Sequence, residues 1–384
     1  MKVQPSDQPP SHRPSRPPAY GAGMKSLAIS VPDDDRTNAH YRARAGDVVS
    51  ALEEKAKMFA GMAMPAGGGD PFSEAMAPYL ADPFRGTVRR RILEPGRKAL
   101  DLELTAARAA LRAAAMSPGD VELLIASSFL PDQVGVGNAV FLARELGMHG
   151  AAWNLETACS SSIVGFETAA ALVQSGQYAN VLVTASCTYS RVLDERNPMA
   201  WQVGDGAGAF VVGRVAPQDG FLGKKVVNTA STCGAFFYEL ALDAGTPVLR
   251  MGADSDAGKL LRDASEVCLR ECTEGALRDA GLRLQDIDWF VFNTPMAWFV
   301  EFAVRVLGFD RARTLDTYPF VANAGPALMP INLFLAANGA NVRPGDRVLL
   351  YSMGGVSSAA AVILRWGEVA LGPAVPGWPP TRLG

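Results

Sequence analysis

The sequence predicts an α/β protein built from two similar halves. Strand-length apolar runs alternate with amphipathic helical segments along most of the 384 residues. A helix, a Gly/Pro turn, an aspartate, an apolar strand, a loop and a second helix follow one another in residues 106–159 and again in residues 269–327. The repeat therefore indicates an internal duplication, with two halves packed face to face around a shared core.

Composition divides the chain into a tail and two halves. Residues 1–23 are rich in Pro, Ser and Gly, so we expect a disordered tail that buries no apolar surface. We assign residues 24–213 to an N-terminal half and residues 214–384 to a C-terminal half. Residues 33–83 have an irregular helical pattern with a break at three consecutive glycines, residues 67–69.

The periodicity then predicts each element in turn, with Gly and Pro marking the ends of helices. The N-terminal half is expected to contain strands at 25–31, 121–129, 151–155, 181–185 and 205–212, and helices at 102–115, 139–146 and 163–175. The C-terminal half is expected to contain helices at 264–280, 301–307 and 327–338, and strands at 287–292, 348–352 and 359–366.

Composition also excludes several classes of protein. With 48% hydrophobic and 20% charged residues, the chain matches an ordinary globular protein with a substantial core. The net charge of −3 gives no overall attraction to nucleic acid or to an anionic membrane, and no apolar run reaches the roughly 20 residues of a spanning helix. The five cysteines form neither a disulfide framework nor a metal-ligand pattern, so we expect a cytoplasmic protein without a metal or a cofactor of its own.

Cys159 is the residue with the clearest chemical context. It lies between an apolar strand and a helix of small residues, in the run Thr157-Ala158-Cys159-Ser160-Ser161-Ser162. A sulfur at a helix N-terminus is close to free backbone N–H groups and to the positive end of the helix dipole, which favour the thiolate. We therefore expect a nucleophile that forms a thioester during acyl transfer, in preference to a buried structural cysteine.

Several motifs, in the right order, resemble the thiolase superfamily and in particular β-ketoacyl-acyl-carrier-protein synthase III. The matching segments are residues 146–150, 157–162, 175–183, 204–209, 346–350 and 354–355. The resemblance implies a thiolase fold with two duplicated halves in an αβαβα layered sandwich. The glycine-rich segment 204–208 lacks the lysine of a phosphate-binding loop, so no nucleotide is implied.

The resemblance also implies three catalytic groups: a cysteine, a histidine after a C-terminal strand, and an asparagine on a later loop. Cys159 matches the first, and Asn323 in Val321-Ala322-Asn323-Ala324-Gly325 matches the third. Asn293 occupies the position of the histidine. None of the three histidines of the chain, His12, His40 and His149, aligns with that position.

The change from histidine to Asn293 ranks the available reactions. A carboxamide donates hydrogen bonds but cannot take up a proton at physiological pH, so it cannot act as a general base. Decarboxylation of a malonyl thioester needs no base, and we expect the amide groups of Asn293 and Asn323 to stabilise the oxyanion that forms. We expect reduced or redirected activity, because neutral donors make weaker bonds than charged ones.

Two further residues complete the expected site. Following the resemblance, the backbone N–H groups of Cys159 and Gly355 form the oxyanion hole for the acylated cysteine. Glu156, three residues before the nucleophile, is a candidate base, although a structural hydrogen bond at the end of the strand is the preferred interpretation.

A group of basic residues suggests how substrates are recognised. Arg85 and Arg89 belong to a positive cluster that continues to Arg97 and Lys98, in a region that the resemblance places beside the phosphopantetheine channel. The cluster is expected either to dock an acyl carrier protein or a CoA phosphate, or to be an ordinary solvated charged face. The resemblance further places Tyr189 in the acyl pocket and implies a homodimer.

The sequence therefore predicts an acyltransferase that loads an acyl group from an acyl carrier protein or acyl-CoA onto Cys159. Decarboxylative C–C condensation in polyketide-type specialised metabolism is the favoured reaction. Acyl transfer to an amine or hydroxyl of a small-molecule acceptor is the first alternative. The second alternative is a non-catalytic partner subunit with a thiolase fold, which the retained Cys159 disfavours.

Overall fold

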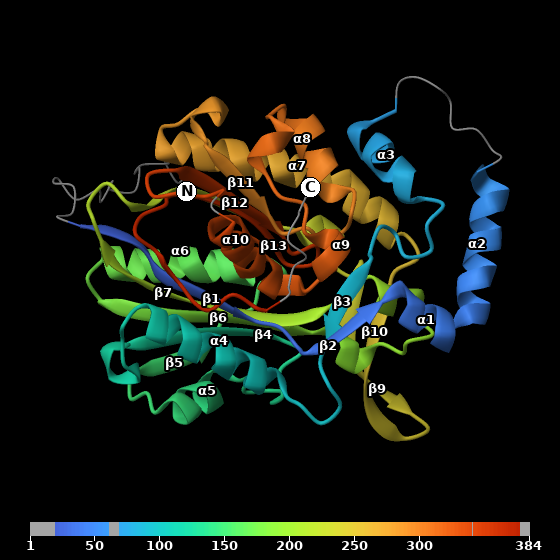
Figure 1. The fold of residues 1–384 in the computed structure, drawn as a ribbon, viewed down its shortest axis with the longest axis horizontal. Helices are drawn as coiled ribbons and strands as arrows, with labels where there is room; N and C mark the ends of the chain where they lie inside the picture. Colours follow the sequence, from blue (N-terminus) through green and yellow to red (C-terminus); the bar gives the residue numbers. More distant parts are fainter. Residues whose placement is uncertain (1–19, 61–68, 340, 377–384) are drawn as a thin grey trace, which may run out of the picture.

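Five layers are stacked in the order helix, sheet, helix, sheet, helix (Figure 1). The computed structural model describes residues 20–60, 69–339 and 341–376. The spatial order of the six-stranded sheet is β14 (Ala370–Leu371), β1 (Gly21–Ser30), β7 (Asp205–Val215), β6 (Asn180–Thr188), β4 (Leu123–Phe129) and β5 (Ala151–Asn154). That of the four-stranded sheet is β11 (Trp289–Phe292), β12 (Arg347–Met353), β13 (Ser358–Arg365) and β8 (Gly220–Asn228).

The helices occupy three layers. The outer face of the six-stranded sheet is covered by α4 (Ala99–Ala113) and α5 (Ala139–Leu146). The space between the sheets is filled by α6 (Ser161–Gln174) and α10 (Leu328–Asn338), and the outer face of the four-stranded sheet is covered by α7 (Ala257–Ala280) and α8 (Phe299–Leu307). The predicted αβαβα sandwich is confirmed.

The sequences of the helices explain which layer each one occupies. Every residue of α10 from Leu328 to Ala336 is buried, as expected for a helix that is apolar on all sides and packs against sheets on both. By contrast, α4 alternates buried alanines and leucines with exposed charged residues, so it covers one face of a sheet and meets water on the other. The main core forms where the two sheets enclose the central helices, around Phe166, Phe210 and Phe334.

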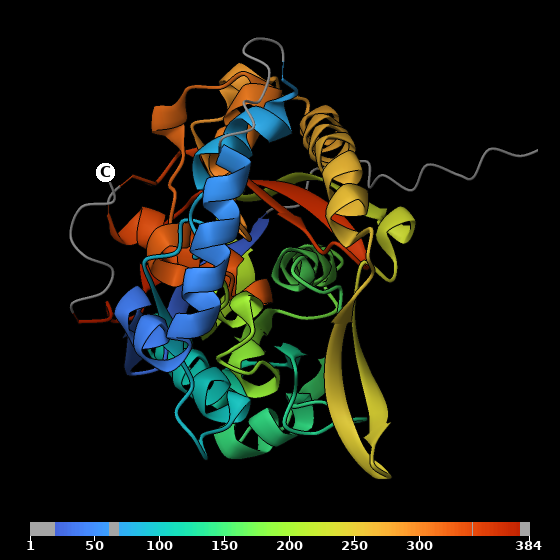
Figure 2. The ribbon, with the colours of Figure 1, turned by 90° about the vertical axis from the view of Figure 1, so that its right-hand side faces the viewer.

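The remaining elements lie around the sandwich. They are β2 (Asp34–Thr37), α1 (Asn38–Arg44), α2 (Gly46–Ala60), α3 (Pro71–Met76), β3 (Arg89–Ile92), β9 (Phe236–Asp243), β10 (Thr246–Ala253) and α9 (Tyr318–Val321). Strands β9 and β10 form a separate two-stranded hairpin that runs along one side of the molecule (Figure 2). Neither β3 nor the hairpin was expected from the sequence.

Two boundaries differ from the predicted organisation. Strand β1 begins at Gly21, so residues 21–23 belong to the six-stranded sheet and not to the expected tail, whose first 19 residues lie outside the described residues. The predicted break at residues 67–69 also lies mostly outside them. The boundary expected after residue 213 falls near the end of β7, but the C-terminal half returns β14 to the N-terminal sheet, where it pairs with β1.

Candidate active site

The turn that carries Cys159 is held in a strained shape by its serine neighbours. Ala158 has a φ of 56°, a conformation that costs a non-glycine residue free energy and is maintained by the surrounding structure. The Ser161 hydroxyl accepts a hydrogen bond from the Thr157 N–H (2.8 Å) and donates one to the Ala158 carbonyl (2.7 Å). The serines after the nucleophile therefore fix the turn that presents the sulfur.

Cys159 lines a large apolar cavity of about 870 Å³, near the upper end of the range for small-molecule sites. Much of the wall consists of aromatic and methionine side chains, among them Phe72, Phe129, Phe236, Met251, Trp298 and Phe299. Tyr189, Asn323 and Gly355 line the same cavity, so the structure brings four of the predicted site residues together.

Burial controls the protonation of the nucleophile. Desolvation raises the pKa of Cys159 to about 11, although a hydrogen bond with the side chain of Tyr189 and one with its own backbone lower it. Burial of the sulfur therefore opposes the thiolate that the helix N-terminus was expected to favour.

Asn293 lies beside the nucleophile, but its amide points at the backbone. The side chain is 2% exposed, and Nδ2 donates to the carbonyls of Cys159 (3.2 Å) and Gly325 (3.0 Å). Ser352 Oγ donates to the same Cys159 carbonyl at 2.8 Å. Both amide hydrogens of Asn293 are thus engaged, and the expectation that this side chain supplies a free oxyanion donor is corrected. Its role in this structure is to hold the nucleophile turn.

Asn323 has the geometry expected of a donor to substrate. Its Oδ1 accepts a hydrogen bond from the Gly325 N–H (2.9 Å), which directs the amide nitrogen away from the backbone. Within the described part of the chain, no group accepts a hydrogen bond from Nδ2. The backbone of Asn323 pairs with Gln202 and Gly204, so the donor projects from a fixed main chain on the cavity wall.

The loop with Gly355 lies directly against the nucleophile turn. A Cβ atom on Gly354 would be 2.3 Å from the Thr157 carbonyl oxygen, so this approach requires glycine. Gly355 itself faces the cavity, and the N–H of Gly355 has no acceptor among the described residues. The loop is therefore placed to let the Gly355 N–H serve as the predicted oxyanion donor.

Glu156 points away from the cavity, towards the end of β4. Its carboxylate accepts hydrogen bonds from the Ser128 N–H (2.8 Å) and Ser127 Oγ (3.3 Å). Desolvation and, to a smaller extent, the charge of Glu103 raise the pKa of Glu156 to about 7, whereas the two hydrogen bonds lower it. The residue nevertheless keeps exposed surface at the edge of the sheet. The structural hydrogen bond at the strand end is observed, and Glu156 does not reach the cavity as a base would need to.

The predicted substrate-binding residues divide into two groups. Tyr189 lines the cavity as expected. Arg85 and Arg89 do not line it: Arg85 Nη1 donates to two backbone carbonyls, and Arg89 forms an ion pair with Asp35 at 2.9 Å. Both guanidinium groups are occupied away from the nucleophile, and their assignment to substrate binding is corrected.

Several residues of the cavity wall were missed by sequence reasoning. Phe236, Tyr238 and Met251 come from the β9–β10 hairpin. A signal was present, because the strands are joined by Ala244-Gly245, both with positive φ, as in the turns typical of two-residue hairpins. Alanine is uncommon at the first of these positions, which hid the turn.

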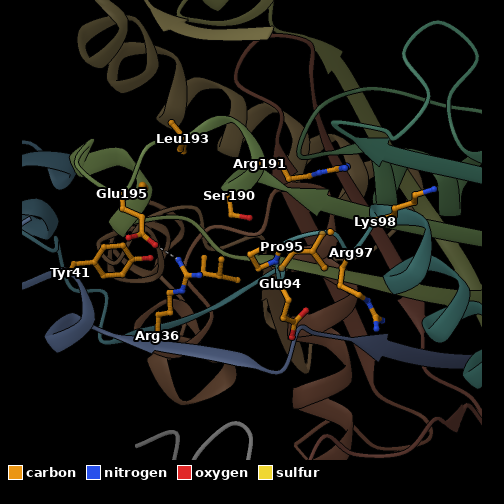
Figure 3. Close-up of a pocket in the computed structure, with 14 residues that line it drawn as sticks. Arg36, Tyr41, Glu94, Pro95, Arg97, Lys98, Ser190, Arg191, Leu193 and Glu195 are labelled. Atoms are coloured by element: carbon orange, nitrogen blue, oxygen red, sulfur yellow. Dashed lines mark hydrogen bonds and ion pairs between the residues drawn. The ribbon is translucent and has the colours of Figure 1, made fainter. Parts of the chain in front are cut away.

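A second cavity of about 390 Å³ lies beside the basic cluster (Figure 3). Arg36, Arg97, Lys98 and Arg191 line it, but within the described chain Lys98 is the one lining cation without an ion-pair partner. This cavity therefore offers little uncompensated positive charge, and the cluster has the character of a solvated, internally paired surface.

Other kinds of site find no support in the described residues. They contain no group of three or more potential metal ligands. None of their helices combines the length and apolar character needed to span a membrane. His40 bonds Glu195 and His149 is exposed, so neither of these two described histidines contributes to the cavity.

The chain is similar to proteins of a known enzyme family. The family model for 3-oxoacyl-[acyl-carrier-protein] synthase III matches residues 153–230, and the model for its C-terminal region matches residues 277–366. The β-ketoacyl-[acyl-carrier-protein] synthase III of Sinorhizobium medicae is 31% identical over 291 residues, which cover 73% of this chain and 88% of the relative. The β-ketoacyl-[acyl-carrier-protein] synthase III of Agrobacterium fabrum is 29% identical over 291 residues, which again cover 73% of this chain and 88% of the relative.

Solved structures show the same fold. The 3-oxoacyl-(acyl carrier protein) synthase III of Pseudomonas aeruginosa superimposes with a TM-score of 0.74 at 20% identity, covering 93% of this chain and all of that one. A histidine-to-asparagine variant of OleA from Xanthomonas campestris gives a TM-score of 0.73 at 21% identity, covering 91% of this chain and 99% of that one.

Proposed function

Because this chain belongs to the 3-oxoacyl-[acyl-carrier-protein] synthase III family of acyltransferases, we propose that it forms an acyl thioester on Cys159 and condenses it with a malonyl thioester. The observation that carries the proposal is that Cys159, Asn323 and Gly355 all line one cavity. The acyl donor is an acyl carrier protein or acyl-CoA, whose phosphopantetheine arm carries the acyl group.

The first half-reaction exchanges one thioester for another. The Cys159 sulfur attacks the donor carbonyl, the bond from that carbonyl to the donor sulfur breaks, and the proton lost by Cys159 leaves with the departing thiol. The developing oxyanion accepts hydrogen bonds from the backbone N–H groups of Cys159 and Gly355. Because aromatic and methionine side chains make up much of its wall, the cavity suits an apolar acyl group.

The second half-reaction needs no general base. Loss of CO₂ from the malonyl thioester forms an enolate, which attacks the acyl carbonyl. The bond from that carbonyl to the Cys159 sulfur breaks, and the released thiolate takes up a proton from water. Asn323 Nδ2 is free to stabilise the enolate oxygen. Asn293 keeps the nucleophile turn in place instead of sharing that task.

We also propose a role in polyketide-type specialised metabolism, supported by the carboxamide at the position of the expected histidine.

A homodimer is supported by the edge position of β5, whose Trp153 is 38% exposed. Like the family resemblance that first suggested a dimer, this edge is open to pairing with a second copy of the chain.

Intact-protein mass spectrometry tests the acyl-enzyme. Incubation with a panel of acyl-CoA and acyl-carrier-protein donors should add one acyl mass to the wild type and to Cys233→Ala, which lacks an exposed cysteine outside the cavity. Cys159→Ala should remain unmodified. The absence of any adduct with any donor would refute the proposal and favour the non-catalytic partner subunit.

The trapped acyl-enzyme then distinguishes the reactions. Offered malonyl thioesters, amines and alcohols in competition, it should release a β-ketoacyl product and CO₂. Amide or ester products without decarboxylation would instead assign acyl transfer to a small-molecule acceptor.

A further inference from the structure

We propose that Arg90 is a positioning residue for Asn323, because its buried guanidinium group fixes the backbone segment 201–204, which in turn holds the backbone of Asn323. The consequence for condensation rests on the proposed function. The contact itself can be tested without any substrate, so the contact and the proposed function can fail separately.

Arg90 differs from the arginines on either side of it in β3. Successive side chains of a strand point to opposite faces, so Arg89 and Arg91 share one face and Arg90 points to the other. Arg89 and Arg91 each form an ion pair with Asp35, at 2.9 and 3.8 Å. Arg90 is 0% exposed, and no carboxylate in the described part of the chain forms an ion pair with it. The strand therefore buries a cation without a counterion, which costs free energy unless its donors are satisfied.

The donors of Arg90 end on neutral acceptors from two other segments. Nε donates to the Trp201 carbonyl at 3.0 Å, and Nη2 donates to the same oxygen. Nη1 donates to Asn38 Oδ1 at 2.8 Å and to the Arg36 carbonyl at 3.4 Å. Hydrogen bonds with a charged donor are roughly twice as strong as bonds between neutral groups. The guanidinium group thus ties segment 201–204 and the N-terminal segment to β3.

Aromatic rings hold the guanidinium group in this orientation. Its carbon Cζ lies 4.7 Å from the centroid of the Tyr41 ring and 5.9 Å from that of the Phe84 ring. The centroids of the Phe84 and Trp201 rings are 5.3 Å apart, and Trp201 Nε1 donates to the Glu195 carbonyl at 2.7 Å. Desolvation lowers the pKa of Arg90 to about 10, so the group keeps its charge at neutral pH. The Trp201 carbonyl therefore faces a fixed cation.

Segment 201–204 holds the main chain of Asn323 from both sides. The Gln202 carbonyl accepts a hydrogen bond from the Asn323 N–H at 3.0 Å, and the Gly204 N–H donates to the Asn323 carbonyl at 2.9 Å. A Cβ atom on Gly204 would lie 2.6 Å from the carbonyl oxygen of Val321, so the two stretches of backbone are in tight contact. A shift of segment 201–204 would therefore move the main chain from which the Asn323 amide projects.

This support matters for condensation and much less for acylation. The Asn323 amide has to reach the enolate oxygen, and a misplacement of about 1 Å in a catalytic group can cost roughly a hundredfold in rate. The turn of Cys159 is held separately, by its own serines and by Asn293. Loss of the Arg90 contact should therefore slow the second half-reaction and spare the first.

A double-mutant cycle tests the positioning role. Arg90→Lys keeps the charge but loses the planar fork, so condensation should be about ten- to a hundredfold slower while acylation of Cys159 is unchanged. In the Asn323→Ala background the same substitution should have no further effect on condensation, because Arg90 acts through Asn323. Arg89→Lys, on the other face of β3, is the matched control and should behave as the wild type in both steps. Condensation by Arg90→Lys at the wild-type rate, or effects of the two substitutions that multiply, would overturn the proposal.

Hydrogen exchange tests the contact without substrate. The backbone amides of Gly204 and Asn323, followed by NMR, should exchange about tenfold faster in Arg90→Lys than in the wild type or in Arg89→Lys. Unchanged exchange overturns the inference. If Arg90→Lys does not fold, Asn38→Ala, which removes the acceptor of Nη1, replaces it and should act in the same direction, with the same outcome excluded. If exchange rises in the variant but the wild type makes no β-ketoacyl product, the proposed function fails while the contact stands.

Discussion

The two halves of the molecule present their chemical residues in the same strained way. Cys159 follows Ala158, whose φ is 56°, and Asn323 follows Ala322, whose φ is 57°. In each half, the strained alanine comes just before a residue that faces the cavity and shortly before a central helix, α6 or α10. The internal duplication is therefore visible at the level of single backbone angles in the active site.

The halves differ in how each turn is secured. The turn of Cys159 is braced by its own serines, and its carbonyl is held by Asn293 and Ser352 from the C-terminal half. The Asn323 backbone is held by the segment around Gln202 from the N-terminal half. Each half thus fixes the functional residue of the other, so the site depends on docking of both.

The largest effect is expected from removing the donor of the C-terminal half. Asn323→Ala should lower the rate of condensation about 10²- to 10³-fold, because the enolate oxygen loses its side-chain hydrogen bond. Acylation of Cys159 should continue, which mass spectrometry of the adduct will show. Asn338→Ala, at the exposed end of α10, is the matched control and should leave both steps unchanged. Equal loss of acylation and condensation would contradict a role confined to the second step.

An intermediate effect is expected where one half holds the other. Asn293→Ala should lower the free energy of unfolding by about 1–3 kcal/mol, because the buried carbonyls of Cys159 and Gly325 lose a donor. Ser352→Ala removes the other donor to the Cys159 carbonyl and should act in the same direction. Urea unfolding measures both. Unchanged stability of Asn293→Ala, together with slow condensation, would identify Asn293 as an oxyanion donor after all.

The smallest effect is expected at Glu156, which does not line the cavity. Glu156→Gln should leave the acidic limb of the pH–rate profile unchanged, since the carboxyl group is hydrogen-bonded to Ser127 and Ser128.

The same substitution should change how stability depends on pH. The pKa of Glu156 in the folded protein, about 7, exceeds the ordinary value of 4.5, so folding favours the protonated form. Its contribution is full below pH 4.5 and is lost as the pH rises towards 7. Thermal unfolding of the variant should therefore depend slightly less on pH in that interval. A shift in the acidic limb of its pH–rate profile would instead identify Glu156 as a base.

The sequence was sufficient for the layers and for the position of Cys159 at the turn before α6, while its role as a nucleophile stays a prediction. Helix α5 was predicted at residues 139–146, where it is found, because its apolar period and the glycine after it are both local signals. The pKa of Cys159 could not be predicted, since burial depends on segments far along the chain. The orientation of Asn293 was also hidden, because its acceptors, the carbonyls of Cys159 and Gly325, become neighbours only through folding.

The pairing of β14 with β1 has a consequence for how the protein is made. Ser26 of β1 lies opposite Ala370 of β14, so this pairing cannot form until residue 370 has been synthesised. At ribosomal speeds of roughly 5–20 residues per second, that interval is on the order of a minute or less. Ser352, which holds the nucleophile turn, emerges just as late. A nascent chain would therefore lack this hydrogen bond to the Cys159 turn until Ser352 had been made.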